Sequence, residues 1–145
     1  MIVHRLCKAA HAALDGEGAR LWGGRWNSPG APMVYTAASP GLAVLEVLVH
    51  LDLPPELIPD DYRILSIEVP DGAAIETLGE VPVDPADCAA IGDDFLRRGE
   101  ALVLRAPSVV VPQETNSLIN PRHEAARDLR LARDEPFRFD PRLLR

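Results

Sequence analysis

SPGLAVLEVLVHL, residues 39 to 51, is the stretch that decides the fold. Serine is a favoured N-cap and proline is favoured at the first helical position, so Ser39 and Pro40 predict the start of a helix. The residues that follow are apolar on nearly every side, which predicts a helix that is buried on most of its surface. Glu46 interrupts this apolar run, and an ionised carboxylate in such surroundings is unfavourable unless it has a partner.

Short segments with strand propensity surround this helix and set the fold class. The segments expected to form strands are residues 1–7, 33–37, 62–70 and 101–112, with strand-like stretches from 128 to the end. Asp84 and Pro85 start a second helix that ends near Gly99, while residues 114–126 are expected to form a polar loop with at most one helical turn. Strands outnumber helices in a mixed order, so we expect one α+β domain over residues 1–145, with a twisted, mainly antiparallel sheet and packed helices.

The charge balance excludes one class of function. The 145 residues carry a formal net charge of -7, because 22 acidic side chains outnumber 15 basic ones. Proteins that bind nucleic acid usually present basic surfaces, so direct binding of DNA or RNA is not expected. The first residues lack the apolar core of a signal peptide, and no apolar run is long enough to span a bilayer. We therefore expect a cytoplasmic protein without membrane attachment.

Several familiar kinds of site are missing from the sequence. Cys7 and Cys88 stand apart, without a cysteine or histidine cluster, so buried free thiols are expected and a metal site is not. The sequence contains no GxGxxG or P-loop motif for a nucleotide and no GxSxG elbow for a serine hydrolase. Chemistry must therefore come from residues outside these motifs.

Glu46 is the sharpest candidate for a functional residue. A carboxylate alone in an apolar helix either serves a site or lies on a narrow exposed stripe. In the second case it could also pair with His50, one turn later. The helix pattern alone leaves both interpretations open.

Other candidates lie before this helix. Arg25 follows two glycines, and an arginine in such a loop can fork two hydrogen bonds to a phosphate or simply face water. Tyr35 could stack on a flat ring or place its hydroxyl at the rim of a strand. Arg5 sits within the first expected strand, where a lone arginine usually marks an edge. Trp22 and Trp26 could stack on a ring, but such aromatics more often anchor a core.

The later polar segment adds weaker candidates. Ser117 lies in it, and loop serines mostly form turns and caps. His123 could act as a general base, although a surface histidine is the commoner case.

Taken together, these residues form a pattern that resembles the RES domain, a family named for its arginine, glutamate and serine. The resemblance rests on GGRWN, VYTA, LEVL and NSLINP in this order, with HR near the start, APSVVVPQETNSLINPRH later and FRFDPRL at the end. It covers nearly the whole chain and implies an ADP-ribosyltransferase-like fold.

The resemblance also implies a substrate and a partner. NAD would be a substrate and no cofactor would be needed, and an antitoxin with an Xre-like DNA-binding domain would join the chain in a hetero-oligomer. Arg5, Arg25, Tyr35 and Glu46 would surround NAD. Ser117 and Asn120 would contact it from the later loop.

The chemistry of NAD explains why those residue types are needed. Breaking the nicotinamide–ribose bond creates an oxocarbenium-like transition state, which the Glu46 carboxylate could stabilise. Arg5 and Arg25 could clamp the pyrophosphate, Tyr35 could hold the nicotinamide, and Ser117 could bond its amide or the ribose.

The acceptor remains open among water, phosphate and a protein side chain. We expect a toxin that degrades NAD as a glycohydrolase or phosphorylase, depletes the cell of NAD and arrests growth. Protein ADP-ribosylation is the alternative, and a binding module without enzymatic activity is a further one. The acidic balance opposes an RNA-cleaving toxin.

Overall fold

The computed structural model describes residues 1 to 144, and its strands form one sheet of seven in the order β4-β5-β6-β2-β1-β3-β7. The strands are β1 (Ile2–Lys8), β2 (Val34–Ala37), β3 (Tyr62–Glu68), β4 (Ile75–Thr77), β5 (Val103–Pro107), β6 (Thr115–Ile119) and β7 (Arg130–Phe137). Every neighbouring pair is antiparallel except β4 and β5, which are parallel. The α+β fold with a mainly antiparallel sheet is therefore confirmed.

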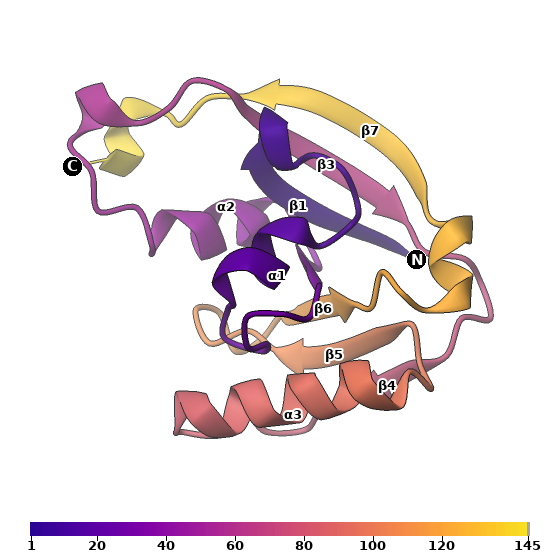
Figure 1. Ribbon diagram of the computed structural model, residues 1–145. Coiled ribbons are helices and arrows are strands. Elements are labelled where there is room, and N and C mark those ends of the chain that lie inside the picture. Colours follow the sequence, from indigo (N-terminus) through magenta and orange to yellow (C-terminus); the bar gives the residue numbers. More distant parts are fainter. Residues whose placement is uncertain (145) are drawn as a thin grey trace.

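Three α-helices and four short 3-10 turns accompany the sheet over the described residues. They are α1 (Glu17–Trp22), α2 (Pro40–Leu48), α3 (Pro85–Arg98) and the 3-10 turns Ala9–His11, Pro55–Leu57, Glu124–Asp128 and Pro141–Leu144. Figure 1 shows α3 along the outer side of β4 and β5, while α1 and α2 lie between that part of the sheet and β1. Within residues 1 to 144, none of the helices combines the length and the apolar character that a bilayer crossing requires.

The predicted start of α2 is confirmed, but the predicted end of the helix and its predicted burial are not. The Ser39 hydroxyl accepts a hydrogen bond of 3.1 Å from the backbone N–H of Leu42, as the predicted N-cap requires. The helix ends at Leu48 and not at Leu51. It packs one face on β1 and β2, so Leu42 is buried, whereas Leu45 is exposed. The prediction of burial on most sides was therefore wrong.

The prediction of a polar loop over residues 114–126 was also wrong in its first half. Residues 115–119 form β6, which lies inside the sheet between β5 and β2. Its three polar residues suggested a loop, but pairing on both edges satisfies the backbone and buries Leu118 and Ile119. Context of this kind overrides strand propensity. The helical turn that was allowed later in this segment is present as Glu124–Asp128.

The sheet opens between its two central strands. Seven residue pairs join β1 to β3, but only the pair of His4 with Ala37 joins β1 to β2. The two parts of the sheet therefore separate on either side of this contact, with β3 and β7 beyond β1 and with β6, β5 and β4 beyond β2 (Figure 1). Three apolar clusters fill the space, under α3, under α2 and around the centre of the sheet.

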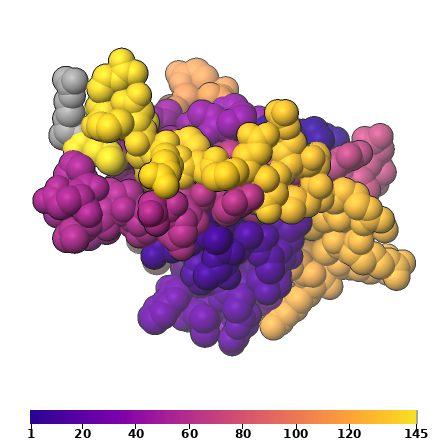
Figure 2. All heavy atoms as spheres, turned by 90° about the horizontal axis from the view of Figure 1, so that it is seen from above, coloured from indigo at the N-terminus to yellow at the C-terminus, as the bar shows by residue number. Residues whose placement is uncertain are grey.

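The strand β7 is an outer edge of this sheet. Every residue of β7 except Phe137 is exposed, and Figure 2 shows the strand running across the surface of the molecule. Charged side chains such as Arg133, together with Pro136 and a bulge near Ser66, make this edge unsuitable for pairing with another strand.

The loop between α1 and β2 is fixed to α3. The Ser28 backbone N–H and hydroxyl donate hydrogen bonds of 2.8 and 2.6 Å to the Asp93 carboxylate. Next to this contact, Gly92 packs directly on the backbone of Trp26, so that a Cβ at residue 92 would overlap the Trp26 carbonyl. The long-range contact therefore depends on a residue without a side chain.

This contact predicts that Gly92→Ala destabilises the fold by about 1–3 kcal/mol or more, because the added methyl group forces the loop away from α3. The matched control is Gly41→Ala in α2, where a Cβ meets no atom within 4 Å. The control should keep or slightly raise stability, since alanine favours helix over glycine. Urea unfolding of both variants measures the difference, and equal midpoints would show that the loop does not depend on this contact.

Candidate functional site

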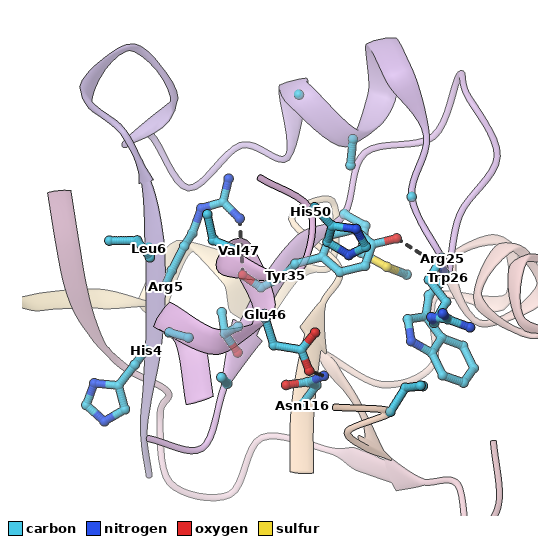
Figure 3. Close-up of a pocket in the computed structure, with 18 of the residues that line it drawn as sticks. His4, Arg5, Leu6, Arg25, Trp26, Tyr35, Glu46, Val47, His50 and Asn116 are labelled. Atoms are coloured by element: carbon cyan, nitrogen blue, oxygen red, sulfur yellow. Dashed lines mark hydrogen bonds between the residues drawn. The ribbon is translucent and has the colours of Figure 1, made fainter. Parts of the chain in front are cut away.

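A pocket of about 350 Å³ lies where β1 and β2 separate. Its walls come from β1, α1, the loop after α1, β2, α2 and the segment around β5 and β6. Arg5, Arg25, Tyr35 and Glu46 all line it, which confirms the prediction that these four residues share one cleft. Figure 3 shows these side chains around the pocket.

Arg5 crosses from β1 to β2. Its Nη1 donates a hydrogen bond of 3.1 Å to the backbone carbonyl of Tyr35, and its Nε is buried without a hydrogen-bond partner among residues 1 to 144. The expectation of a strand edge facing water was wrong, since β1 is a central strand and Arg5 is half-buried. A buried, positively charged donor without a partner favours an anionic ligand in the pocket.

Arg25 reaches the pocket from the loop after α1. Its side chain is exposed, and no hydrogen bond or ion pair to it occurs within the described residues. The preceding Gly24 is required for close packing, because a Cβ there would lie 2.5 Å from the Tyr35 hydroxyl. The loop thus presents a free guanidinium at the pocket while its backbone is held tightly.

The Tyr35 hydroxyl holds that loop. It accepts a hydrogen bond of 3.0 Å from the backbone N–H of Trp26 and donates one of 2.6 Å to Asn27 Oδ1. Burial of the phenol raises the pKa of Tyr35 well above its usual value, so the hydroxyl remains a proton donor at neutral pH. Its hydroxyl is an anchor for the Arg25 loop, while its side chain also lines the pocket.

Glu46 points from α2 into the pocket, and its hydrogen-bond donors come from β6 and from the segment after β5. Its Oε1 accepts hydrogen bonds of 2.7 Å from the Ser108 hydroxyl and 2.8 Å from Asn116 Nδ2. Figure 3 shows Glu46 and Asn116 facing each other. Within residues 1 to 144 no hydrogen bond involves Oε2, and none links Glu46 to His50, although His50 also lines the pocket. The proposed pairing with His50 is therefore absent.

Ser108 and Asn116 are the residues that the sequence analysis missed. Ser108 follows β5 and is buried, and its hydroxyl also accepts hydrogen bonds from the backbone N–H groups of Val110 and Val111. The serine that contacts the glutamate is thus Ser108 and not Ser117. The signal was the turn-forming serine between two strand-like stretches, but only the paired sheet brings it to α2.

Ser117 and Asn120 do not line the pocket. Side chains alternate along a strand, so Ser117 points to the opposite face of β6 from Asn116, and it is buried there opposite Thr36. The Asn120 side chain instead accepts a hydrogen bond of 3.0 Å from the backbone N–H of Arg122. The structure therefore does not bring these two predicted residues to the other four.

The other residues considered in the sequence are the histidine of the later polar segment, the two tryptophans and the two cysteines. His123 Nδ1 accepts a hydrogen bond of 3.0 Å from the backbone N–H of Ala125, so His123 caps a 3-10 turn. Trp26 is buried in the core and also lines the pocket, while Trp22 is exposed and does not line it. The predicted buried free thiols are confirmed at Cys7 and Cys88. In the described part of the chain, no three metal-ligating side chains gather into one cluster.

Comparison with known proteins gives a consistent result. Residues 2 to 140 match the family model of the RES domain. The chain is 40% identical over 147 residues to Toxin Res of Pseudomonas putida, with 99% of each chain covered. It is 39% identical over 142 residues to the Prs ADP-ribosylating toxin of a Sphingobium species, covering 91% of this chain and 87% of that protein.

A solved structure shares the fold. A chain in the crystal structure of the Mycobacterium tuberculosis MbcT–MbcA toxin–antitoxin complex matches with a TM-score of 0.76 and 23% identity. The match covers 94% of this chain and 83% of that one. At this identity the likeness concerns the fold.

The hydroxyl network predicts that Tyr35→Phe destabilises the protein by about 1–3 kcal/mol, because the Trp26 N–H and the Asn27 side chain lose a buried partner. Tyr62→Phe is the matched control. Tyr62 is also buried, but among residues 1 to 144 its hydroxyl makes no hydrogen bond. Denaturant unfolding should show a clearly smaller loss for the control, and equal losses would contradict the anchoring role of Tyr35.

Proposed function

The chain belongs to the RES domain family, and from this membership and the pocket we propose that it is the toxin of a toxin–antitoxin pair that cleaves NAD. The observation that carries the proposal is one carboxylate and two arginines in the same pocket. Within residues 1 to 144, one oxygen of Glu46 has no hydrogen-bond partner, and neither Arg5 nor Arg25 forms an ion pair with an acidic side chain. This combination suits a ligand with both a developing positive charge and a pyrophosphate.

The proposed reaction breaks the bond between the ribose carbon and the nicotinamide nitrogen. The electron pair of this bond leaves with nicotinamide, which becomes neutral, and positive charge develops on the ribose. The Glu46 carboxylate stabilises that charge, and the arginines hold the pyrophosphate in place. An acceptor oxygen then bonds to the ribose carbon that carried nicotinamide, and the acceptor releases a proton. With water as the acceptor the product is ADP-ribose. With phosphate as the acceptor the product is ADP-ribose that carries a phosphate on that carbon.

The hydrogen bonds to Glu46 support this role. Two donors on one oxygen hold the carboxyl group in a single orientation. The second oxygen remains available for the substrate. A group fixed in this way needs little reorganisation when charge develops in the transition state.

Protein ADP-ribosylation is the second candidate, and one relative favours it. The Sphingobium protein, 39% identical to this chain, is named an ADP-ribosylating toxin. Both reactions share the cleavage of the nicotinamide–ribose bond and differ only in the acceptor. We retain NAD breakdown as the first candidate because it needs no second macromolecule at the open pocket.

The proposed antitoxin would neutralise the chain by covering the pocket. The two proteins would form a hetero-oligomer in which the antitoxin carries the DNA-binding domain. The MbcT–MbcA complex shows that a protein of this fold assembles with an antitoxin. The net charge of -7 makes the chain itself a poor ligand for DNA. An Xre-like domain would therefore supply the contact with the operator.

The experiment that tests the function is product analysis of NAD incubated with the purified chain, with and without phosphate. If water is the acceptor, nicotinamide and ADP-ribose should appear in both reactions. If phosphate is the acceptor, nicotinamide and the phosphorylated ADP-ribose should appear only in the reaction that contains phosphate. Expression in cells should deplete NAD and stop growth, and the cognate antitoxin should restore both. Intact NAD in the test tube and in growth-arrested cells would point to another target. Nicotinamide release only after a protein acceptor is added would favour ADP-ribosylation.

Glu46→Gln should lower NAD turnover about 100- to 1000-fold, because it removes a charge that acts mainly in the transition state. The glutamine side chain can still accept hydrogen bonds from Ser108 and Asn116, so the melting temperature should change little. Glu56→Gln is the control, since Glu56 is exposed on a 3-10 turn away from the pocket. Steady-state rates beside thermal melts decide the outcome. A folded Glu46→Gln protein with the parent rate would end the catalytic assignment.

A further inference from the structure

The two tryptophans of the chain have opposite environments. Trp26 is 3% exposed and belongs to the core, whereas Trp22 is 81% exposed at the end of α1. A large aromatic side chain of this kind is usually buried, so its exposure needs an explanation. The proposed chemistry of the pocket uses Trp26 only as a core residue and does not use Trp22.

The helix α1 directs one face toward the pocket. Gly18 and Ala19 line the pocket, and so do Gly23 and Gly24 directly after the helix. Residues three and four positions apart share a helix face, so Trp22 lies on the same face as Gly18 and Ala19, one turn further on. Trp22 does not itself line the pocket, and it lies one helical turn beyond the two lining residues of α1.

The pocket is small for the whole of the proposed substrate. Its volume of about 350 Å³ lies near the lower end of the roughly 300–1,000 Å³ that is usual for small-molecule sites. NAD consists of two nucleosides joined by a pyrophosphate. If the reacting half lies at Glu46, as the proposed function requires, the pyrophosphate would reach Arg25, which is exposed at the pocket. The second nucleoside would then lie beyond Arg25, outside the pocket.

We propose that Trp22 is the platform on which the adenine ring of NAD stacks. Trp22 lies three residues before Arg25, on the face of α1 that carries its two lining residues, and it has an open aromatic surface. Every base offers a flat face for stacking, and an aromatic side chain holds it without hydrogen bonds. This inference rests on the proposed function and assigns the adenosine half of the same substrate.

A protein partner is the competing explanation, because exposed tryptophans also act as anchors in interfaces. The adenine ring is favoured because Trp22 lies one turn beyond the lining residues Gly18 and Ala19, next to a pocket that is small for the whole substrate. Leu21, its neighbour, is 51% exposed. Because it is two residues after Ala19, it lies on the opposite side of the helix from that lining residue, whereas Trp22 lies one turn after it. This difference in direction makes Leu21→Ala a matched control for the loss of exposed apolar surface.

The kinetic test compares Trp22→Ala, Trp22→Phe and Leu21→Ala in steady-state NAD consumption. Loss of one base–aromatic stack should raise the KM of Trp22→Ala for NAD about 5- to 100-fold, with a smaller change in kcat. Trp22→Phe should recover most of the affinity, and Leu21→Ala should behave like the parent. A folded Trp22→Ala protein with an unchanged KM would overturn the proposal while leaving the proposed function intact.

The binding test uses the intrinsic fluorescence of Trp22 and does not require turnover. Adenosine monophosphate, which carries the adenine ring, should quench the exposed tryptophan of the parent protein, and ribose 5-phosphate, which lacks a base, should not. Most of the quenching should disappear in Trp22→Ala, where only Trp26 remains, which is buried although it also lines the pocket. If the protein consumes no NAD, the proposed function fails and this measurement still decides the role of Trp22. Quenching by the antitoxin but not by adenosine monophosphate would assign Trp22 to the partner and overturn the proposal.

Discussion

The separation of β1 from β2 is the constraint on which the rest of the structure depends. The strands share one residue pair and then part, which leaves backbone groups of β2 without partners on the neighbouring strand. Buried carbonyl groups need a hydrogen bond, and Arg5 supplies it by donating to the Tyr35 carbonyl across the opening. The same guanidinium stabilises the open sheet and puts positive charge beside the pocket. One side chain therefore combines a structural role with the ligand-binding role that we propose for it.

The other side chains of the pocket are fixed by contacts that are distant in sequence. The Tyr35 hydroxyl on β2 ties down the loop that carries Arg25, and Asp93 on α3 holds the same loop through Ser28. Glu46 on α2 is held by donors from the opposite part of the sheet. Glu46 is half-buried, and the two donors satisfy one of its oxygens although no lysine or arginine pairs with it in the described residues. Rigid support of this kind is what a site for charge stabilisation needs.

Local signals in the sequence were enough for some of these features. The Ser39 cap fixes the start of α2, and the four residues that share the pocket were found through the family resemblance. The partners of Glu46 could not be found in this way, because Ser108 and Asn116 reach it only after β5 and β6 pair within the sheet. The polar β6 looked like a loop for the same reason, and this error hid the fact that its neighbouring side chains point to opposite faces. A local sequence pattern does not show which strands pair when they lie far apart in the chain.

The central claim is that the open pocket orients NAD with its reacting ribose at Glu46. A crystal structure of the Glu46→Gln protein with NAD bound tests it most directly, because slow turnover preserves the substrate. We predict the ribose carbon that bears nicotinamide beside residue 46 and the pyrophosphate beside Arg5 and Arg25. NAD bound elsewhere on the chain, or bound in this pocket with its reacting ribose away from residue 46, would contradict the account.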